Sequence, residues 1–197
     1  MTPQAFKNSW TNTDEPLSTL SKSRLDRFNL QKSTSDFFRA AGLPGYCEPH
    51  LSFANDTDDI YYGISKLTEQ YDFEEEEPQF AKYIVIGSCR DGDVIAIDTD
   101  DNDKIVQLDH EDSFASMYFN SSVETLADFL ILYRDFETEV LQGKDPNDNF
   151  QCYNFTDEQF ERLKSKMYSV DSGAVTERGF WKEELELMLI FRQENFL

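Results

Sequence analysis

The chain has 197 residues, and its 39 acidic against 18 basic side chains give a formal net charge of −21 at pH 7. This charge disfavours unassisted binding to nucleic acid or to an anionic membrane, so a charged partner is expected to be basic. The composition excludes a disordered chain, because 39% of the residues are hydrophobic and 17 of them are Phe. The length predicts one domain with a buried core.

The cysteines and the chain ends indicate where the protein works. Cys47, Cys89 and Cys152 are widely spaced and form no CxxC motif, which favours reduced, cytosolic thiols. The first residues lack the basic segment and apolar run of a secretion signal. The longest apolar runs, "FLILY" and "LMLIF", are far shorter than the roughly 20 residues that span a membrane. We expect a soluble, cytoplasmic protein.

The N-terminal part differs from the rest of the chain. Residues 1–31 are polar with a weak helical pattern, and we expect a loosely attached arm or an amphipathic helix there. Residues 32–197 are expected to form a single α+β domain. Its first element, "STSDFFRAAGLPG", is typical of a short helix that ends at Gly42 and Pro44.

Strand patterns fill the region between Leu51 and Phe119. Short β-branched or aromatic segments are separated by Asp, Asn and Gly, which favours an antiparallel meander of about six strands. The acidic residues fall mostly at hairpin tips and strand ends. The segments are "LSF", "IYYGI", "KYIVIG", "DVIAID", "KIVQLD" and "MYFN", with "SCRDGD" and "TDDND" as two tight connections.

Three helices are predicted to follow. "NSSVETLADFLILYRDFETEVL" repeats apolar residues at three and four and should lie across one sheet face, and "FTDEQFERLKSKMYSV" and "TERGFWKEELELMLIFRQ" follow it. The first two starts have capping-box spacing, and the second adds a hydrophobic staple. The residues concerned are Ser121 and Glu124 in the first helix, and Thr156, Gln159, Phe155 and Phe160 in the second.

One acidic loop partly matches a calcium-binding loop. Asp98, Asp100 and Asn102 stand at its first, third and fifth positions. The sixth position is Asp103 where the motif needs glycine, the twelfth is Asp109 and not Glu, and strands flank the loop where helices are required. A solvated hairpin is expected instead, with no metal.

Other chemical motifs are weak. "GSCRDGD" continues with Asp93 where a phosphate-binding loop supplies Lys and Ser or Thr, so nucleotide binding is not expected. His50 and His110 have no nucleophile motif around them, and we interpret both as structural or surface residues. No catalytic residue and no cofactor are predicted.

Two acidic clusters are the candidate partner-binding residues. They form either a solvated face or a docking surface for a basic partner, in which case they would speed the encounter while an aromatic or aliphatic patch supplies most of the affinity. The candidates are Glu74, Glu75, Glu76 and Glu77 in one run, and Asp100, Asp101 and Asp103 at one hairpin tip.

Five segments occur in an order that is similar to a known family: "FFRAAGLPG", "YIVIGSCRDGDVIAID", "KIVQLDHED", "YFNSSVETLADFLILYRDF" and "YSVDSGAVTERGFW". Spanning roughly Thr34 to Phe191, they resemble the SUKH superfamily, and most closely its fourth group, SUKH-4, of bacterial immunity proteins. The chain differs from the usual pattern at Cys89 and Arg90, where small residues are expected, and at Ser172, where proline is expected.

The resemblance implies an α+β fold with an antiparallel sheet flanked by helices, and no enzymatic activity. Members act as antidotes to toxins encoded beside them, often nucleases or deaminases of polymorphic toxin or contact-dependent competition systems. We therefore expect a cognate basic toxin as partner, which the chain would neutralise by occlusion. Two alternatives stay open: a scaffold or regulator with this fold and no toxin, and a divalent-metal-dependent enzyme that uses the acidic loop.

Overall fold

The computed structural model describes residues 1–11, 15–73, 77–145, 148 and 150–196. Its main sheet has seven strands in the order β3-β4-β6-β7-β8-β9, with β5 paired to β6, and all pairs are antiparallel. A second sheet pairs β1 with β2. The strands are β1 (Leu17–Ser18), β2 (Leu43–Pro44), β3 (Tyr46–Cys47), β4 (Leu51–Phe53), β5 (Ser65–Lys66), β6 (Tyr83–Ser88), β7 (Val94–Asp98), β8 (Lys104–Asp109) and β9 (Ala115–Asn120).

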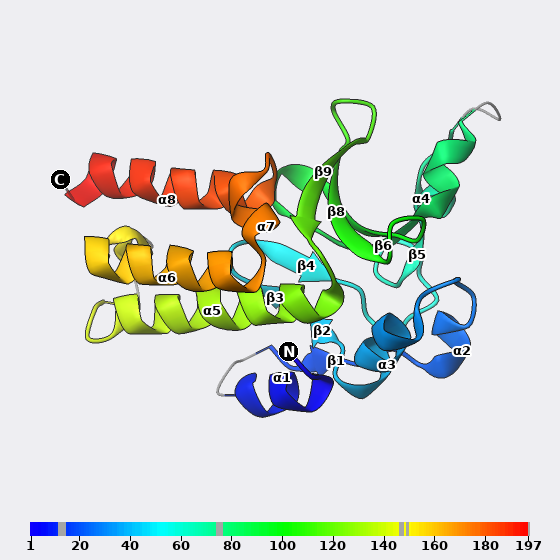
Figure 1. Cartoon of the computed structure of the whole chain (residues 1–197), viewed down its shortest axis with the longest axis horizontal. Helices are drawn as coiled ribbons and strands as arrows, with labels where there is room; N and C mark the ends of the chain where they lie inside the picture. The colour runs from blue at the N-terminus through cyan, green and yellow to red at the C-terminus, as the bar shows by residue number, and fades with distance from the viewer. Residues whose placement is uncertain (12–14, 74–76, 146–147, 149, 197) are drawn as a thin grey trace.

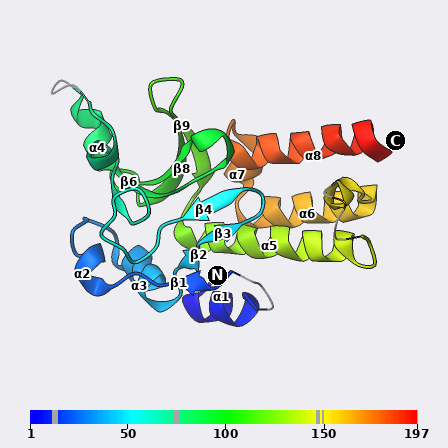
Figure 2. The ribbon, with the colours of Figure 1, turned by 180° about the vertical axis from the view of Figure 1, so that it is seen from behind.

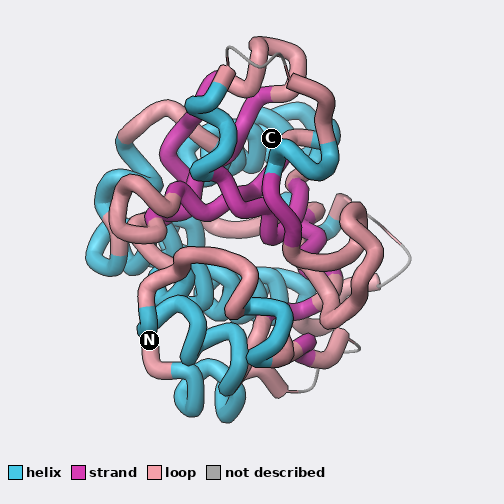
Figure 3. Tube along the Cα trace, turned by 90° about the vertical axis from the view of Figure 1, so that its right-hand side faces the viewer, coloured by secondary structure: helices cyan, strands magenta, loops and turns pink. Residues whose placement is uncertain are grey.

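Helices flank the sheet, as the α+β prediction requires. Helices α5, α6 and α8 run side by side and extend past the strands (Figures 1 and 2), whereas the helices near the N-terminus gather on another side of the strands (Figure 3). The helices are α1 (Pro3–Ser9), α2 (Lys22–Leu25), α3 (Lys32–Ala40), α4 (Leu67–Gln70), α5 (Val123–Leu141), α6 (Asp157–Val170), α7 (Ser172–Thr176) and α8 (Phe180–Phe196), with 3-10 turns η1 (Pro78–Lys82), η2 (Arg90–Gly92) and η3 (Gln151–Tyr153).

The predicted meander is confirmed, because β6, β7, β8 and β9 pair in sequence order. The β7–β8 connection closes where the Lys104 N–H donates to the Asp101 carbonyl at 3.0 Å. Between them, Asn102 and Asp103 have φ values of 55° and 57°. This is type I′ turn geometry, which matches the twist of the paired strands and which Asn and Asp tolerate well.

The strand predicted in "IYYGI" is wrong, because residues 60–62 form a turn and only Ser65 and Lys66 pair with β6. Asp59 organises this turn. Its carboxylate accepts a hydrogen bond from the Tyr61 N–H at 2.9 Å, and its carbonyl accepts one from the Gly63 N–H at 2.8 Å. These local bonds compete with a sheet ladder, as Asp side chains commonly do in turns.

The predicted capping box is confirmed for helix α6 and is shifted for helix α5. Thr156 and Gln159 form the predicted capping box of α6, and Phe155 stacks on Phe160 with ring centroids 5.5 Å apart. The box of α5 lies one residue later than predicted, between Ser122 and Thr125. The reason is tertiary: the Ser121 N–H donates to the Asp171 carboxylate at 2.7 Å, which fixes Ser121 before the helix begins.

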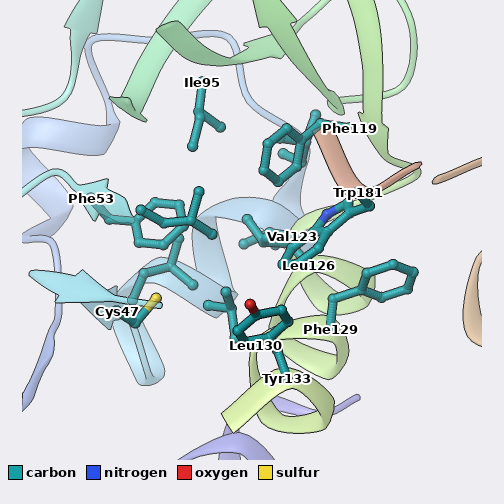
Figure 4. Packing of buried hydrophobic residues seen from close by; sticks show 14 of the residues in the cluster. Cys47, Phe53, Ile95, Phe119, Val123, Leu126, Phe129, Leu130, Tyr133 and Trp181 are labelled. Carbon is teal, nitrogen blue, oxygen red and sulfur yellow. The ribbon is translucent and has the colours of Figure 1, made fainter. Parts of the chain in front are cut away.

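The sheet buries both faces. Side chains such as Ile95 and Ile105 point to the main core with α5, where Phe119, Phe129 and Trp181 pack together (Figure 4). Alternate residues point to a smaller cluster on the opposite face, as the two-residue period of strands dictates. That cluster is formed by Leu67, Phe80, Tyr83, Val85, Val94, Ala96, Val106 and Leu108.

Residues 1–11 and 15–31, the segment for which the sequence suggests an arm or an amphipathic helix, contribute several side chains to the main core. Phe6 is 0% exposed and contacts Phe37 with ring centroids 5.8 Å apart. Leu20 and Leu25 are also buried in the same cluster. Burying large apolar side chains releases water from their surfaces, so these contacts stabilise the position of the N-terminal segment.

Candidate partner-binding surface

Of the acidic residues predicted to bind a partner, the structure describes Glu77, Asp100, Asp101 and Asp103. Glu74, Glu75 and Glu76 fall outside the described residues, and Glu77 is half-buried at the start of η1. Asp100 and Asp101 are exposed at the β7–β8 turn. The Asp101 carboxylate forms an ion pair with Lys104, which partly neutralises this tip.

Asp103 differs from the exposed position that the sequence suggests. Its side chain is buried, with the residue 2% exposed, and its carboxylate accepts a hydrogen bond from the Gln31 N–H at 2.6 Å. The left-handed backbone at Asn102 and Asp103 turns the second residue inward, toward the start of α3. Asp103 is therefore a structural anion and cannot present its charge to a partner.

Other acids at the strand ends also serve the fold. Asp98 is 5% exposed and pairs with Lys82 at 2.8 Å. Asp109 accepts hydrogen bonds from the N–H groups of Glu111 and Asp112 at 3.0 and 3.1 Å, which shapes the β8–β9 turn. Much of the charge in this stretch thus satisfies backbone donors and half-buried lysines, and the outermost carboxylates remain accessible.

Two tyrosines that the sequence places in a strand form the most exposed aromatic feature of the described residues. Tyr61 is 70% and Tyr62 is 69% exposed. They line a pocket of about 370 Å³ that also includes Val85 and Val94. Because these two valines belong to the smaller cluster, the pocket lies on the sheet face opposite α5. We call it the tyrosine pocket; its other lining residues are Gly45, Ser52, Phe53, Ala54, Asn55, Gly63, Gln70, Tyr71, Gly87, Ser88 and Gly92.

The loop that carries the tyrosines is held by hydrogen bonds to its backbone. Gln70 donates from Nε2 to the Ile60 carbonyl at 2.6 Å, and the Asn55 N–H donates to the Tyr62 carbonyl at 2.8 Å. The Asp59 turn fixes Tyr61 from the other side. The rings are therefore exposed on a positioned loop, so that little ordering of its backbone would accompany binding.

Acidic side chains surround the same loop. Asp56 and Asp58 both pair with Arg24, at 2.7 and 3.0 Å, yet the Asp58 side chain is 99% exposed. Asp59 is exposed as well. The loop therefore carries three carboxylates, which the single guanidinium of Arg24 does not neutralise, and the rim of the tyrosine pocket keeps a negative charge. The sequence signal for this loop is "NDTDDIYYG", in which a run of Asp precedes two adjacent aromatic residues that a half-buried strand could not expose together.

Polar side chains from η2, α5 and α8 form a second cluster. Glu184 is 3% exposed and accepts hydrogen bonds from Arg90 at 2.6 Å and from the Tyr133 hydroxyl at 2.9 Å. Burial, together with the charges of Glu48 and Glu184, raises the pKa of Glu137 to about 7. Arg90 departs from the small residue of the family pattern, and its ion pair to Glu184 gives that departure a structural role.

The described residues contain no group of three or more His, Cys, Asp or Glu side chains that could hold a metal ion. In the hairpin with calcium-like spacing, Asp98 pairs with Lys82 and Asp103 bonds to Gln31. His110 donates or accepts at Nδ1 with the Asp93 carboxylate at 2.8 Å, and this contact raises the pKa of His110. Among the described helices, none has the length and apolar character to cross a membrane.

Comparison with known proteins agrees with the motif order. The family model described as "SUKH-4 immunity protein" matches residues 10–188. The match begins within the N-terminal segment, whose buried side chains join the main core. No curated protein and no solved structure matches the chain.

Proposed function

We propose that this chain, which belongs to the SUKH-4 immunity protein family, binds a basic protein toxin and inhibits it by covering its active surface. Binding alone would suffice, with no reaction catalysed by the chain. We place this function in the cytoplasm, where the thiols of Cys47, Cys89 and Cys152 would stay reduced.

The exposed tyrosine pair supports this proposal most strongly. Large aromatic side chains supply much of the affinity at protein interfaces, because they bury a large apolar area while the hydroxyl stays hydrogen-bonded. Tyr61 and Tyr62 stand on a loop fixed by Asp59 and Gln70, beside a pocket of about 370 Å³ that can receive a partner's side chain. We infer that this surface is the centre of the interface.

The charge of the chain suits a basic partner. A net charge of −21 accelerates encounter with a cationic protein over long range. A nuclease needs cationic residues to hold phosphate groups, and an acidic protein seated on those residues would exclude the substrate. Nuclease toxins are therefore the partner class that we propose first, and deaminases that act on nucleic acid fit the same argument.

Co-purification with the product of the adjacent gene tests the function. We expect the chain to bind that toxin and to abolish its activity on nucleic acid at equimolar amounts. The double variant Tyr61→Ala/Tyr62→Ala should bind about 100-fold more weakly, since two central aromatic anchors are removed. Its circular dichroism and melting temperature should match those of the unchanged protein, because both rings are already exposed.

Tyr168→Ala is the matched control, because Tyr168 is 57% exposed on α6, outside the tyrosine pocket. We expect it to bind the toxin normally. Equal losses for Tyr168→Ala and the double variant would contradict this choice of surface. Failure of the unchanged chain to bind any toxin encoded beside it would contradict the function itself and favour a scaffold or regulator.

A further inference from the structure

A second pocket lies across the β6–β7 turn from the tyrosine pocket. Ser88, Gly92 and Val94 of this region line the tyrosine pocket, whereas Cys89, Arg90 and Asp93 line the second one. Its volume is about 220 Å³, several times the roughly 30 Å³ that one water occupies in the liquid. We call it the glutamine pocket; its remaining lining residues are Gln107, Asp109, Met117, Arg178, Phe180, Glu183 and Leu187.

Gln107 is the unusual residue of this pocket. It is 6% exposed, and its Nε2 donates to the Asp93 carboxylate at 2.7 Å. Its Oε1 is buried and has no hydrogen-bond partner within the part of the chain that the structure describes. The reverse amide orientation would put Oε1 against a carboxylate oxygen, two acceptors in contact, so the observed orientation is the favourable one. A buried acceptor without a donor is costly, and a ligand that brings an N–H group would remove that cost.

The charges around Gln107 favour a cation. Three carboxylates line the pocket, those of Asp93, Asp109 and Glu183. Of the two arginines in the lining, Arg90 is paired with the buried Glu184 at 2.6 Å, and Arg178 is exposed. The three carboxylates outnumber the two guanidinium groups of the lining, and the unpaired Gln107 oxygen can only accept, so a cationic donor is favoured over an anion.

We propose that the glutamine pocket binds a guanidinium group, presented by an arginine side chain of the partner protein. Guanidinium is planar, always charged and rich in N–H donors, so it can bond an amide oxygen and a carboxylate at once. The apolar lining of Met117, Phe180 and Leu187 can pack along the methylene stem of the arginine. That the guanidinium belongs to a toxin rests on the proposed function. That the pocket binds guanidinium does not.

Side-chain amide NMR of the whole chain, unbound, tests the proposal without any toxin. The probe is ethylguanidinium chloride, compared with tetramethylammonium chloride at equal ionic strength, which carries the charge but no N–H donor. We expect ethylguanidinium to shift the Gln107 side-chain resonances saturably and tetramethylammonium to leave them unchanged. Equal shifts with both salts, shifts with sodium phosphate in place of ethylguanidinium, or no shift at all would each overturn the proposal.

Substitutions test which side chains bind ethylguanidinium. Gln107→Met keeps the length of the side chain without its acceptor and should weaken ethylguanidinium binding about tenfold, as read from backbone resonances of β8 and β9. Glu183→Gln lies on the half-exposed surface of α8, so it should fold normally and weaken binding less. Gln193→Met, an exposed glutamine farther along α8, is the control and should bind like the unchanged protein. Unchanged binding in both Gln107→Met and Glu183→Gln would refute the site, while toxin binding by the same proteins reports separately on the proposed function.

Discussion

The Asp103 carboxylate accepts a hydrogen bond from the backbone N–H of Gln31 at 2.6 Å, across 72 positions of sequence. Gln31 is the residue that precedes α3, and its side chain makes no cap hydrogen bond. The anion of Asp103 therefore stands near the positive end of α3 and attaches that helix to the β7–β8 turn.

Asp103→Asn should lower the free energy of unfolding by about 1 kcal/mol, because a charge-assisted hydrogen bond becomes a neutral one. Asn tolerates the left-handed backbone at this position, so the change isolates the loss of charge. Urea unfolding followed by circular dichroism measures it. Asp101→Asn is the control at the exposed side of the same turn, and a loss as large as that of Asp103→Asn would contradict the structural role of Asp103.

The two acidic clusters of the sequence predict an effect on the rate of toxin binding. Replacing Asp100 and Asp101 by Lys, or Glu74 to Glu77 by Lys, should slow association about tenfold at low salt, since a partner of opposite charge is no longer attracted. The difference should shrink as salt screens the charges. Stopped-flow or surface-based kinetics across a salt series would reveal it, and an association rate that stays unchanged at low salt would remove these residues from the encounter surface.

Glu137 predicts an unusual dependence of stability on pH. Its pKa is raised from 4.5 to about 7 in the folded protein, chiefly by burial. Between these values the folded protein keeps a proton that the unfolded chain releases, so the contribution of Glu137 to stability is lost as pH rises toward 7. Glu137→Gln should therefore be more stable than the unchanged protein at pH 8, by about 1–3 kcal/mol, and nearly equal to it at pH 4.5.

Denaturant titrations at the two pH values check this expectation. Glu139→Gln serves as the contrasting variant, because Arg162 and Gln159 lower the pKa of Glu139 on the same helix. It should bring no gain in stability at pH 8. A Glu137→Gln protein that is less stable at pH 8 than the unchanged chain would show that the Glu137 charge is well compensated in the fold.

Ser172 marks a place where the family pattern suggests a stabilising change. It is the first residue of α7, and the preceding Asp171 has an extended backbone, with φ −152° and ψ 91°. Proline favours the first position of a helix and restricts the unfolded chain, so Ser172→Pro should raise stability by about 0.5–1 kcal/mol. Calorimetric melting tests it, with Ser172→Ala as the control; a lower melting temperature for the proline variant would show that the Ser172 N–H is needed.

By itself, the sequence determined the features that depend on near neighbours. Alternation predicted the meander, the Thr156 and Gln159 spacing predicted the cap of α6, and the order of motifs indicated the SUKH-4 family. These three features depend on contacts between residues that are close in sequence, or on the order of segments. Local contacts and segment order can both be recognised from the sequence.

Only the tertiary structure decided which charged and aromatic side chains are available to a partner. Asp103 appears in the sequence as one more acid of a hairpin tip, yet its bond to Gln31 buries it. Tyr61 and Tyr62 match a strand pattern, yet Asp59 and Gln70 hold them in a loop with both rings exposed. Exposure depends on which distant segment packs against a residue, and Gln31 and Asp103 meet only after the chain has folded.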